Sequence, residues 1–543
     1  MITKVSVENR NLNSLQKYNS VNNNNDSLKK TDLSFKNAPL GFVLWGLQRC
    51  EENPMLNVAV VDMCSAILPR TLVESKTNLH AGFEAFRRES SGLIVNCLIP
   101  SLIACGAAFG LNKFIMPKGS NMSTCWADYA LIDKITNLYS KSTSIDKVKD
   151  VLKQLLGNIE GVDRDQNVIL KDKLKNELDV YVDKLKKLIE SNKTGKELRD
   201  EIKQISNDIA SKVHIYENIK IKGETDVKLS NLNSALKDFV KFFKEYNKVE
   251  KTVNIETFAK KSKYLVNGKS ILGLSIVLPL AASMQYINRW ITKKTSGIDG
   301  APIYEDFGAK ENEELRKKSQ EGLLKQKMIS ISSMLGVALL SMMKLPSWNM
   351  LQFKGWFPTM DQARIISATT FASRMAVADD KNELAEATVR DIATFLGLYF
   401  LGDYAGKGVA TIVEKKTGVK LLNHTKPIAK DANAIQKFWH WFKDVNIKSS
   451  EEVVSKTQES LNGQAPTEEQ VKKIVKELKK ARNWRSCCQV ANLVVSLILL
   501  GAIVPSWTRN KTKKKHEEQL KQVQMDKDSN LVSSSTKIRN AEI

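Results

Sequence analysis

The chain alternates between apolar runs that carry almost no charge and long segments rich in lysine, glutamate and asparagine. The clearest charge-free run, residues 486–505, is preceded by Arg485 and followed by Trp507 and Arg509. About 20 apolar residues in a helix span the hydrocarbon of a bilayer, and cations and tryptophans are enriched at its two interfaces. This run therefore predicts a transmembrane helix.

Three further runs have the same character, at residues 91–111, 270–287 and 328–343, and each has Lys or Arg near it. A weaker run, 392–413, and two short runs, 55–69 and 363–378, contain charged residues. Short, charged apolar runs are typical of re-entrant or interfacial helices. We expect an all-α, polytopic helical membrane protein with about 5 to 7 spans. The alternative is a large soluble protein in which these helices are buried.

The largest polar segment, residues 118–268, has apolar residues at steps of three and four. The pattern recurs over residues 148–159, 174–189, 198–209 and 229–243, with turn residues such as Gly161 and Gly195 between the repeats. Such spacing is typical of amphipathic helices. The segment predicts a large extramembrane helical bundle, or a coiled-coil hairpin, inserted between spans. It is either a solvated structural bundle or a partner-binding domain.

A second polar insert contains Phe438, Trp439, His440, Trp441 and Phe442 in succession. These rings suit either a membrane interface or a packed core. The expected organisation of the chain is a disordered tail (1–37), a membrane region (38–117), the Lys-rich bundle (118–268), a second membrane region (269–413), a second helical insert (414–485), a transmembrane helix (486–507) and a basic polar tail (508–543). The first 37 residues lack the apolar core of a cleavable signal peptide.

Composition narrows the expected partners. The net charge is +23 while aromatic residues make up 7% of the chain, and no nucleic-acid-binding motif accompanies the lysines. Lys and Arg clusters beside apolar runs favour anionic lipid headgroups instead. We therefore expect a lipid bilayer partner, no nucleic acid, and a multi-pass location in a membrane, with a bacterial-type plasma membrane favoured.

The sequence offers few groups for catalysis. None of the five histidines has metal-ligand spacing to another ligand residue, and the seven cysteines form no paired motif. The segment from Gly402 to Gly408 resembles a phosphate-binding loop but is one residue short and has Gly in place of the magnesium-binding Ser or Thr. We expect no enzyme activity, no metal and no cofactor.

Ionisable residues within apolar runs are the better functional candidates, because a charge in hydrocarbon costs at least about 2.5 kcal/mol. The candidate intramembrane residues are Asp62, Arg374 and Asp403. The candidate charges at the mouths of helices are Arg70, Glu89, Arg390 and Asp391. The competing structural interpretation places Asp62 and Arg374 on interfacial helices and pairs Asp403 with Lys407 one turn later.

The two halves of the chain share an order of parts. Aligning each residue with the one 304 positions later matches Pro54 to Pro358 and Arg70 to Arg374, and in each half a short polar link, an apolar run, a polar insert and another apolar run follow. Two other pairs of similar segments do not fit this offset; one pair consists of Pro346-Ser347-Trp348 and Pro505-Ser506-Trp507. Duplication is therefore one of two interpretations. The other is that similar residues recur wherever a helix leaves the membrane.

These patterns lead to three functional hypotheses. The first is a non-catalytic membrane scaffold or tether that binds a partner through residues 118–268. The second is a secondary transporter built from two related halves, with Asp62, Arg374 and Asp403 near the midplane. A membrane-embedded enzyme is third, because no nucleophile, base or metal set can be named.

Overall fold

The computed structural model describes residues 54–297, 322–342, 351–447 and 468–508 apart from short gaps, with a few isolated positions outside these ranges. The protein is mostly helical, as predicted. Within the described part, five helices are long and apolar enough to cross a membrane: Met55–Ser75, Gly82–Ile115, Ile255–Thr295, Leu323–Ser341 and Asn483–Thr508. The predicted disordered tail (1–37) and most of the basic tail (508–543) lie outside the described residues.

The chain divides into two compact units. We call the first the apolar unit, residues 55–105, 271–404 and 492–543, and the second the polar unit, residues 1–54, 106–270 and 405–491. Each unit draws on several separate stretches of sequence, and helices α6, α13, α19 and α22 run from one unit into the other. The two units are described in turn.

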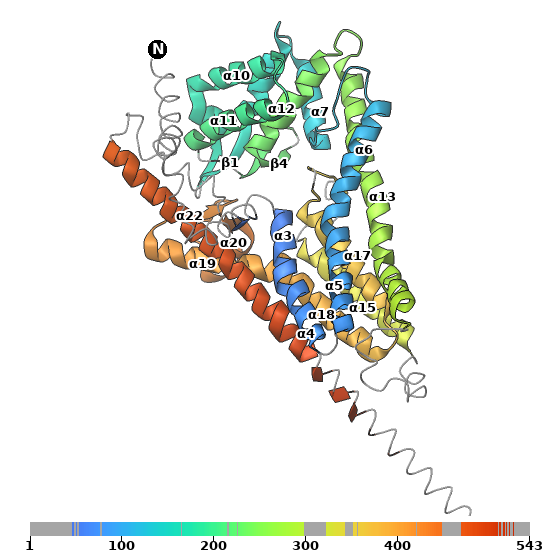
Figure 1. Ribbon diagram of the computed structural model, residues 1–543. Coiled ribbons are helices and arrows are strands. Elements are labelled where there is room, and N and C mark those ends of the chain that lie inside the picture. The colour runs from blue at the N-terminus through green and yellow to red at the C-terminus, as the bar shows by residue number, and fades with distance from the viewer. Residues whose placement is uncertain are drawn as a thin grey trace, which may run out of the picture. The chain divides into compact units, whose positions relative to one another are not determined.

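The apolar unit contains two similar pairs of helices (Figure 1). The first pair consists of α3 (Pro54–Asp62), η2 (Met63–Ile67) and α4 (Leu68–Ser75), followed by α5 (Leu79–Leu93), η3 (Ile94–Leu98) and α6 (Ile99–Ile115). The second pair consists of α17 (Met360–Val377), followed by α18 (Lys381–Leu396), η7 (Gly397–Leu401) and α19 (Gly402–Thr417). In each pair, three residues separate the two helices.

The second helix of each pair is interrupted by a π-helical turn, which begins after 15 residues in the first pair and after 16 residues in the second. Residues 79–115 and 381–417 each form one continuous helix, with the π turns η3 at Ile94–Leu98 and η7 at Gly397–Leu401. The first pair has a further π turn, η2, in its first helix, which α17 lacks. Single π turns inside α-helices are rare and occur often at functional sites.

Two other elements pack against these pairs within the apolar unit. Helix α15 (Leu323–Ser341) packs on α17 and α18, and the π turn η9 (Leu497–Ile503) packs on η2 and α4. The η9 contact is close, because a Cβ added at Gly501 would come within 2.9 Å of the Ser65 carbonyl oxygen. Only glycine therefore fits at position 501 without displacing backbone.

The polar unit contains a four-stranded sheet that the sequence analysis did not predict. Its strands are antiparallel in the order β2-β1-β3-β4: β1 (Ile159–Asp163), β2 (Gln166–Ile169), β3 (Glu217–Ile221) and β4 (Val227–Asn231). Its main helices are α7 (Tyr129–Lys141), α8 (Lys147–Gly157), α10 (Leu178–Glu190), α11 (Gly195–Val213) and α12 (Leu232–Asn247). The expected all-helical bundle is therefore wrong for this segment, which is an α+β domain.

The predicted amphipathic faces nevertheless form its core. Leu152, Leu185, Ile209 and Phe239 lie in one continuous cluster of buried side chains. The helices begin where the sequence supplies N-caps, since the Asp146 carboxylate accepts from the Lys149 amide and the Asn231 side chain accepts from the Ser234 amide. The domain therefore has one continuous core, to which Leu265 and Val266 of the long helix that follows it also contribute.

A buried lysine joins this domain to the long helix α13 (Ile255–Ser296). Lys269 is fully buried, and its Nζ donates to the carbonyl oxygens of Cys125 at 2.7 Å and Ser123 at 3.3 Å. The same ammonium lies 4.1 Å from the centroid of the Trp126 ring. These contacts compensate the burial of the charge and bring the two ends of the insert together.

The second insert packs around the end of α19. A two-stranded sheet, β5 (Leu422–His424) with β6 (Val445–Ile447), flanks α20 (Ala434–Asp444), and α22 (Glu468–Ser496) packs its Cys488 against α19. Residues 448–467 of the predicted insert lie outside the described residues.

Candidate functional site

Five of the seven predicted site residues converge in the apolar unit. We call Arg70, Glu89, Arg374, Arg390 and Asp391 the central cluster. They come from four helices, α4, α5, α17 and α18. The side chains of Arg70, Glu89 and Arg374 are 6 to 8% exposed and that of Asp391 is fully buried. Residues about 300 positions apart in the chain therefore share one buried site.

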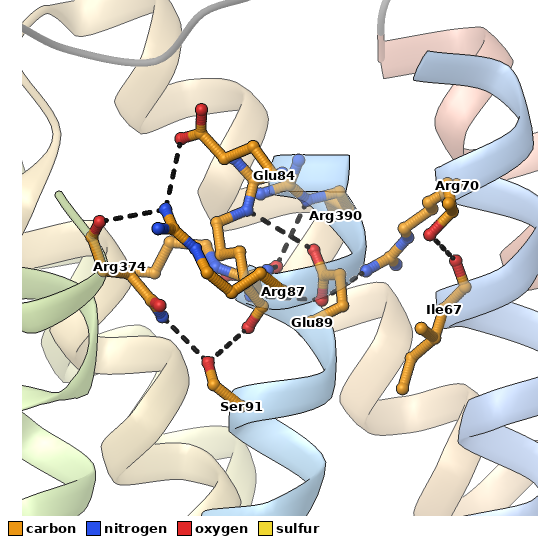
Figure 2. Close-up of polar contacts among 12 residues, drawn as sticks. Ile67, Arg70, Glu84, Arg87, Glu89, Ser91, Arg374 and Arg390 are labelled. Carbon is orange, nitrogen blue, oxygen red and sulfur yellow. Dashed lines mark hydrogen bonds and ion pairs between the residues drawn. The ribbon is translucent and has the colours of Figure 1, made fainter. Parts of the chain in front are cut away.

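Glu89 lies between two guanidinium groups (Figure 2). Its Oε2 accepts from Arg70 Nη1 at 3.3 Å and from Arg374 Nη2 at 3.1 Å. Arg70 also donates from Nη2 to the Thr394 hydroxyl at 2.6 Å. One carboxylate oxygen of α5 thus links α4 to α17, and Arg70 links α4 to α18.

Asp391 plays the corresponding part in the second helix pair. Its Oδ1 accepts from Arg374 Nη1 at 2.8 Å and from Arg390 Nε at 3.3 Å. The ion pairs Arg70–Glu89 and Arg374–Asp391 therefore occupy matching places, each joining the first helix of a pair to the second. Arg374 crosses between the pairs, because it binds both carboxylates.

The central cluster has more hydrogen-bonding capacity than its members use. The Nε atoms of Arg70 and Arg374, Glu89 Oε1 and Asp391 Oδ2 are buried and have no hydrogen-bond partner among the described residues. Buried polar atoms are usually satisfied by protein or by ordered water. Both donors and acceptors are therefore available here for water or a small polar ligand.

A small cavity of about 20 Å³ lies beside the central cluster. Glu89 and Arg374 form its charged wall, and Asp62 lines it as well. Its neutral polar lining comes from Asn96, Ser367, Thr370, Thr394 and Tyr399. Space of this size holds about one water molecule, so the cavity in this conformation accommodates water or a small ion and not an organic solute.

Two of the three π turns of the helix pairs line this cavity, and the third begins beside it. Asp62 directly precedes η2, Asn96 and Cys97 belong to η3, and Leu398 and Tyr399 belong to η7. A π turn inserts one extra residue and rotates the following side chains around the helix axis. The unusual backbone and the polar cavity therefore coincide.

Most of the neutral polar groups in the lining bind one another. The Ser367 and Tyr399 hydroxyls lie 2.7 Å apart, and the Thr370 hydroxyl donates to Asn96 Oδ1 at 2.9 Å. No described residue forms a hydrogen bond to the Asp62 side chain. Asp62 thus contributes a carboxyl group to the cavity without a direct side-chain partner.

Asp403, the remaining candidate, lies apart from this site. Its Oδ1 accepts from the Asn492 amide at 3.4 Å, a contact between α19 and α22. Lys407, its expected partner, instead donates to the Phe442 carbonyl oxygen at 3.1 Å and lies over the Trp441 ring. The structure therefore brings Asp62 and Arg374 to one cavity but does not place Asp403 there.

A second polar contact joins α5 to α13 close to the central cluster (Figure 2). Arg87 Nη2 donates to the Thr292 hydroxyl at 2.6 Å, and the Thr292 hydroxyl donates to Glu84 at 2.7 Å. One turn along, the Asn288 amide donates to the Ser91 hydroxyl at 2.8 Å. These contacts fix the rotation of α5, which carries Glu89.

Sequence reasoning missed the neutral half of the site. Asn96, Ser367 and Thr370 lie in apolar runs, where single Ser, Thr and Asn residues are common and usually bond within their own helix or to a neighbour. Their spacing gives one signal, since Ser367, Thr370 and Arg374 fall on one helical face at steps of three and four. Among the described residues, no group of three or more His, Cys, Asp and Glu side chains is placed to hold a metal ion.

Comparisons with known proteins give no relative to which the chain can be assigned. No family model matches it, and neither a curated protein nor a solved structure matches it.

Proposed function

We propose that this chain is a non-catalytic, multi-pass membrane protein and that its apolar unit moves a small ion or solute across the bilayer. The membrane assignment is supported by the five long apolar helices and by large apolar side chains on their surfaces. Leu102 is 72% exposed and Leu340 is 78% exposed. Extended apolar surfaces of this kind are covered by lipid or by a partner.

The central cluster carries the transport proposal. A buried ionisable residue in a membrane segment is costly, and such residues usually mark the path or the binding site of an ion or substrate. Here Arg374, Glu89 and Asp62 face one polar cavity at the meeting point of two helix pairs. Transporters often place their sites between two structural repeats, in helices with interrupted backbone.

An internal duplication is part of this proposal. It is supported by the matching ion pairs Arg70–Glu89 and Arg374–Asp391, by the equal lengths of helices 79–115 and 381–417, and by the π turns η3 and η7, whose positions in these helices differ by one residue. The absence of a π turn from α17 is a departure from the symmetry. Asp62 also has no acidic counterpart, because Ile366 stands 304 positions later.

Charge movement in reconstituted membranes tests the transport proposal. Proteoliposomes on a solid-supported membrane would be exposed to concentration jumps of protons, sodium ions or chloride. We expect a transient current for at least one ion, reduced about tenfold or more in Arg374→Lys, because lysine cannot bind two carboxylates in the geometry of a guanidinium. Lys426→Ala, at an exposed position of the polar unit, is the matched control.

The absence of current for all three ions would contradict the proposal and favour the second candidate, a membrane scaffold or tether. That candidate is supported by the polar insert, which has one continuous core and many exposed lysines. Deletion of residues 120–262 distinguishes the two candidates. A transporter would keep its current after this deletion, whereas a scaffold would keep membrane insertion and lose a co-purifying partner.

A further inference from the structure

The cavity beside the central cluster contains two carboxyl groups in different surroundings. Glu89 is held by two arginines, Arg70 and Arg374, and a third, Arg88, has its Nε 3.8 Å from Glu89 Oε1. Asp62 has no cation in direct contact and receives no hydrogen bond from any described residue. The two groups line the same small space.

Surroundings of these two kinds favour opposite protonation states. A carboxylate between guanidinium groups stays ionised, whereas a carboxyl group removed from water without a cation in contact is stabilised when it is neutral. Glu89 meets the first condition, and Asp62, which is half-buried beside the cavity and has no cation in contact, is nearer to the second. A proton that enters the cavity therefore finds its acceptor at Asp62.

The charged and titratable groups around Asp62 come from every element that packs on it. They are Arg70 of α4, Glu89 of α5, Cys97 of η3, Arg374 of α17 and Tyr399 of η7. The Tyr399 hydroxyl is already paired with Ser367, and Glu89 is paired with arginines. Asp62 is therefore the group in this set whose charge can change with the least disturbance of existing contacts.

The lining also argues against a metal cation as the occupant. Sodium and similar ions bind through several oxygen ligands at once, and among the described residues no group of three or more His, Cys, Asp and Glu side chains is placed to hold a metal ion. A proton needs only one acceptor, and a single water molecule, which fits the volume of about 20 Å³, can deliver it.

We propose that Asp62 is the proton-binding group of this cavity: hydronium in the cavity transfers a proton to the Asp62 carboxylate and leaves a neutral carboxylic acid and one water molecule. Glu89 and the arginines of the central cluster keep their charges during this step. The proposal deepens the proposed transport function by naming the proton as the ion, but binding of the proton can be measured without transport.

Infrared difference spectroscopy tests proton binding directly in the full chain. The protein in lipid nanodiscs would be moved between pH 5 and pH 8, with protons as the only ligand. We expect a carboxylic acid C=O band, sensitive to exchange into D2O, that disappears on deprotonation. Asp62→Asn should lose that band and Asp62→Glu should retain one at a shifted frequency, while Asp403→Asn, outside the cavity, should keep the wild-type band.

The proposal would be overturned if the wild-type protein showed no carboxylic acid C=O band that changes between pH 5 and pH 8. It would also be overturned if Asp62→Asn kept the wild-type band unchanged. Should Asp62→Asn fail to fold, an unshifted band in Asp62→Glu overturns it equally. The two proposals fail separately. If Asp62 titrates but proteoliposomes show no proton current, proton binding stands and the transport proposal is contradicted. If sodium or chloride carries a current and Asp62 does not titrate, the transport proposal stands and proton binding at Asp62 is contradicted.

Discussion

At the scale of single residues, Arg374 is the side chain on which the central cluster depends most. Its guanidinium binds Asp391 at 2.8 Å and Glu89 at 3.1 Å, and so joins α17 to both α18 and α5. A lysine has one charged nitrogen and cannot reproduce this two-sided geometry. Removal of Arg374 takes a hydrogen-bonding cation away from two buried carboxylates at once.

We therefore predict that Arg374→Ala lowers the free energy of unfolding by about 3 to 5 kcal/mol, the usual effect of removing one partner of a buried ion pair. Thermal unfolding of the purified protein in detergent measures the change. The double variant Arg374→Met with Asp391→Leu should cost less than the sum of the two single variants, because neither member of that ion pair is then left unpaired and Glu89 keeps its contact with Arg70.

The exposed ion pair Lys426–Asp444 gives the control, since Lys426 is 73% exposed and its loss should change stability by less than about 1 kcal/mol. Equal unfolding temperatures for Arg374→Ala and Lys426→Ala would mean that the central cluster does not hold the helices together.

The sequence identifies the charged half of the site and not its neutral half. Arg374, Glu89 and Asp391 stand out because charges in or beside apolar runs are costly. That Arg374 binds Glu89, 285 positions earlier in the chain, depends on helix packing, which no local pattern contains. Asn96 and Thr370 can be recognised as site residues only from that packing, because neither residue is unusual in an apolar helix.

At the scale of elements, the helices follow the apolar periodicity and the strands do not. Leu229 continues the steps of three and four that lead into α12, yet it lies in β4. Strand β1, with the sequence IEGVD, is short and carries two acidic residues, so it lacks the apolar alternation that predicts a strand. Pairing with β3, about 60 residues later, supplies the hydrogen bonds that local sequence does not specify.

Helix α20 is unusual because none of its 11 side chains is buried. Ile435, Phe438 and Trp439 are 68%, 56% and 49% exposed and share one helical face. The opposite side contacts α19 and β5. There the Trp441 indole N–H donates to the Thr411 hydroxyl, and His440 Nε2 lies 3.0 Å from His424 Nδ1. Both interpretations of the aromatic residues therefore apply, one to each face of the helix: one face packs against α19 and β5, and the other is exposed.

We propose that the apolar face of α20 lies in the headgroup region of the membrane, where aromatic rings and nearby lysines are favourable.

An environment-sensitive fluorophore placed on α20 tests this. In a cysteine-free version of the chain, a label at Phe438→Cys in vesicles that contain phosphatidylglycerol should emit at shorter wavelength and be quenched by brominated lipid. A label at Lys437→Cys, on the opposite face of the same helix, should remain in a polar environment. Equal emission and quenching at the two positions would show that the apolar face does not enter the membrane.

At the scale of the whole molecule, the number of membrane crossings between the two polar inserts decides how the halves are oriented. Helices α13 and α15 are long and apolar enough to cross. Helix α17 and the helix 381–417 are separated by three residues and pack on each other. We expect these two helices either both to cross or both to stay re-entrant. The count between the inserts is then two or four.

An even count places both inserts on the same side of the membrane and makes the two halves parallel. We predict that cysteines at Ser191 and Lys426, introduced into a cysteine-free chain, react with a membrane-impermeant maleimide from the same side of sealed, oriented vesicles. Thr295→Cys, an exposed position one crossing further along α13, should react only from the other side.

Reaction of Ser191→Cys and Lys426→Cys from opposite sides of the membrane would mean that only one of the two helices α17 and 381–417 crosses it. The halves would then be inverted, and the shared site of Arg374 and Glu89 would lie on the pseudo-two-fold axis of an inverted-repeat transporter.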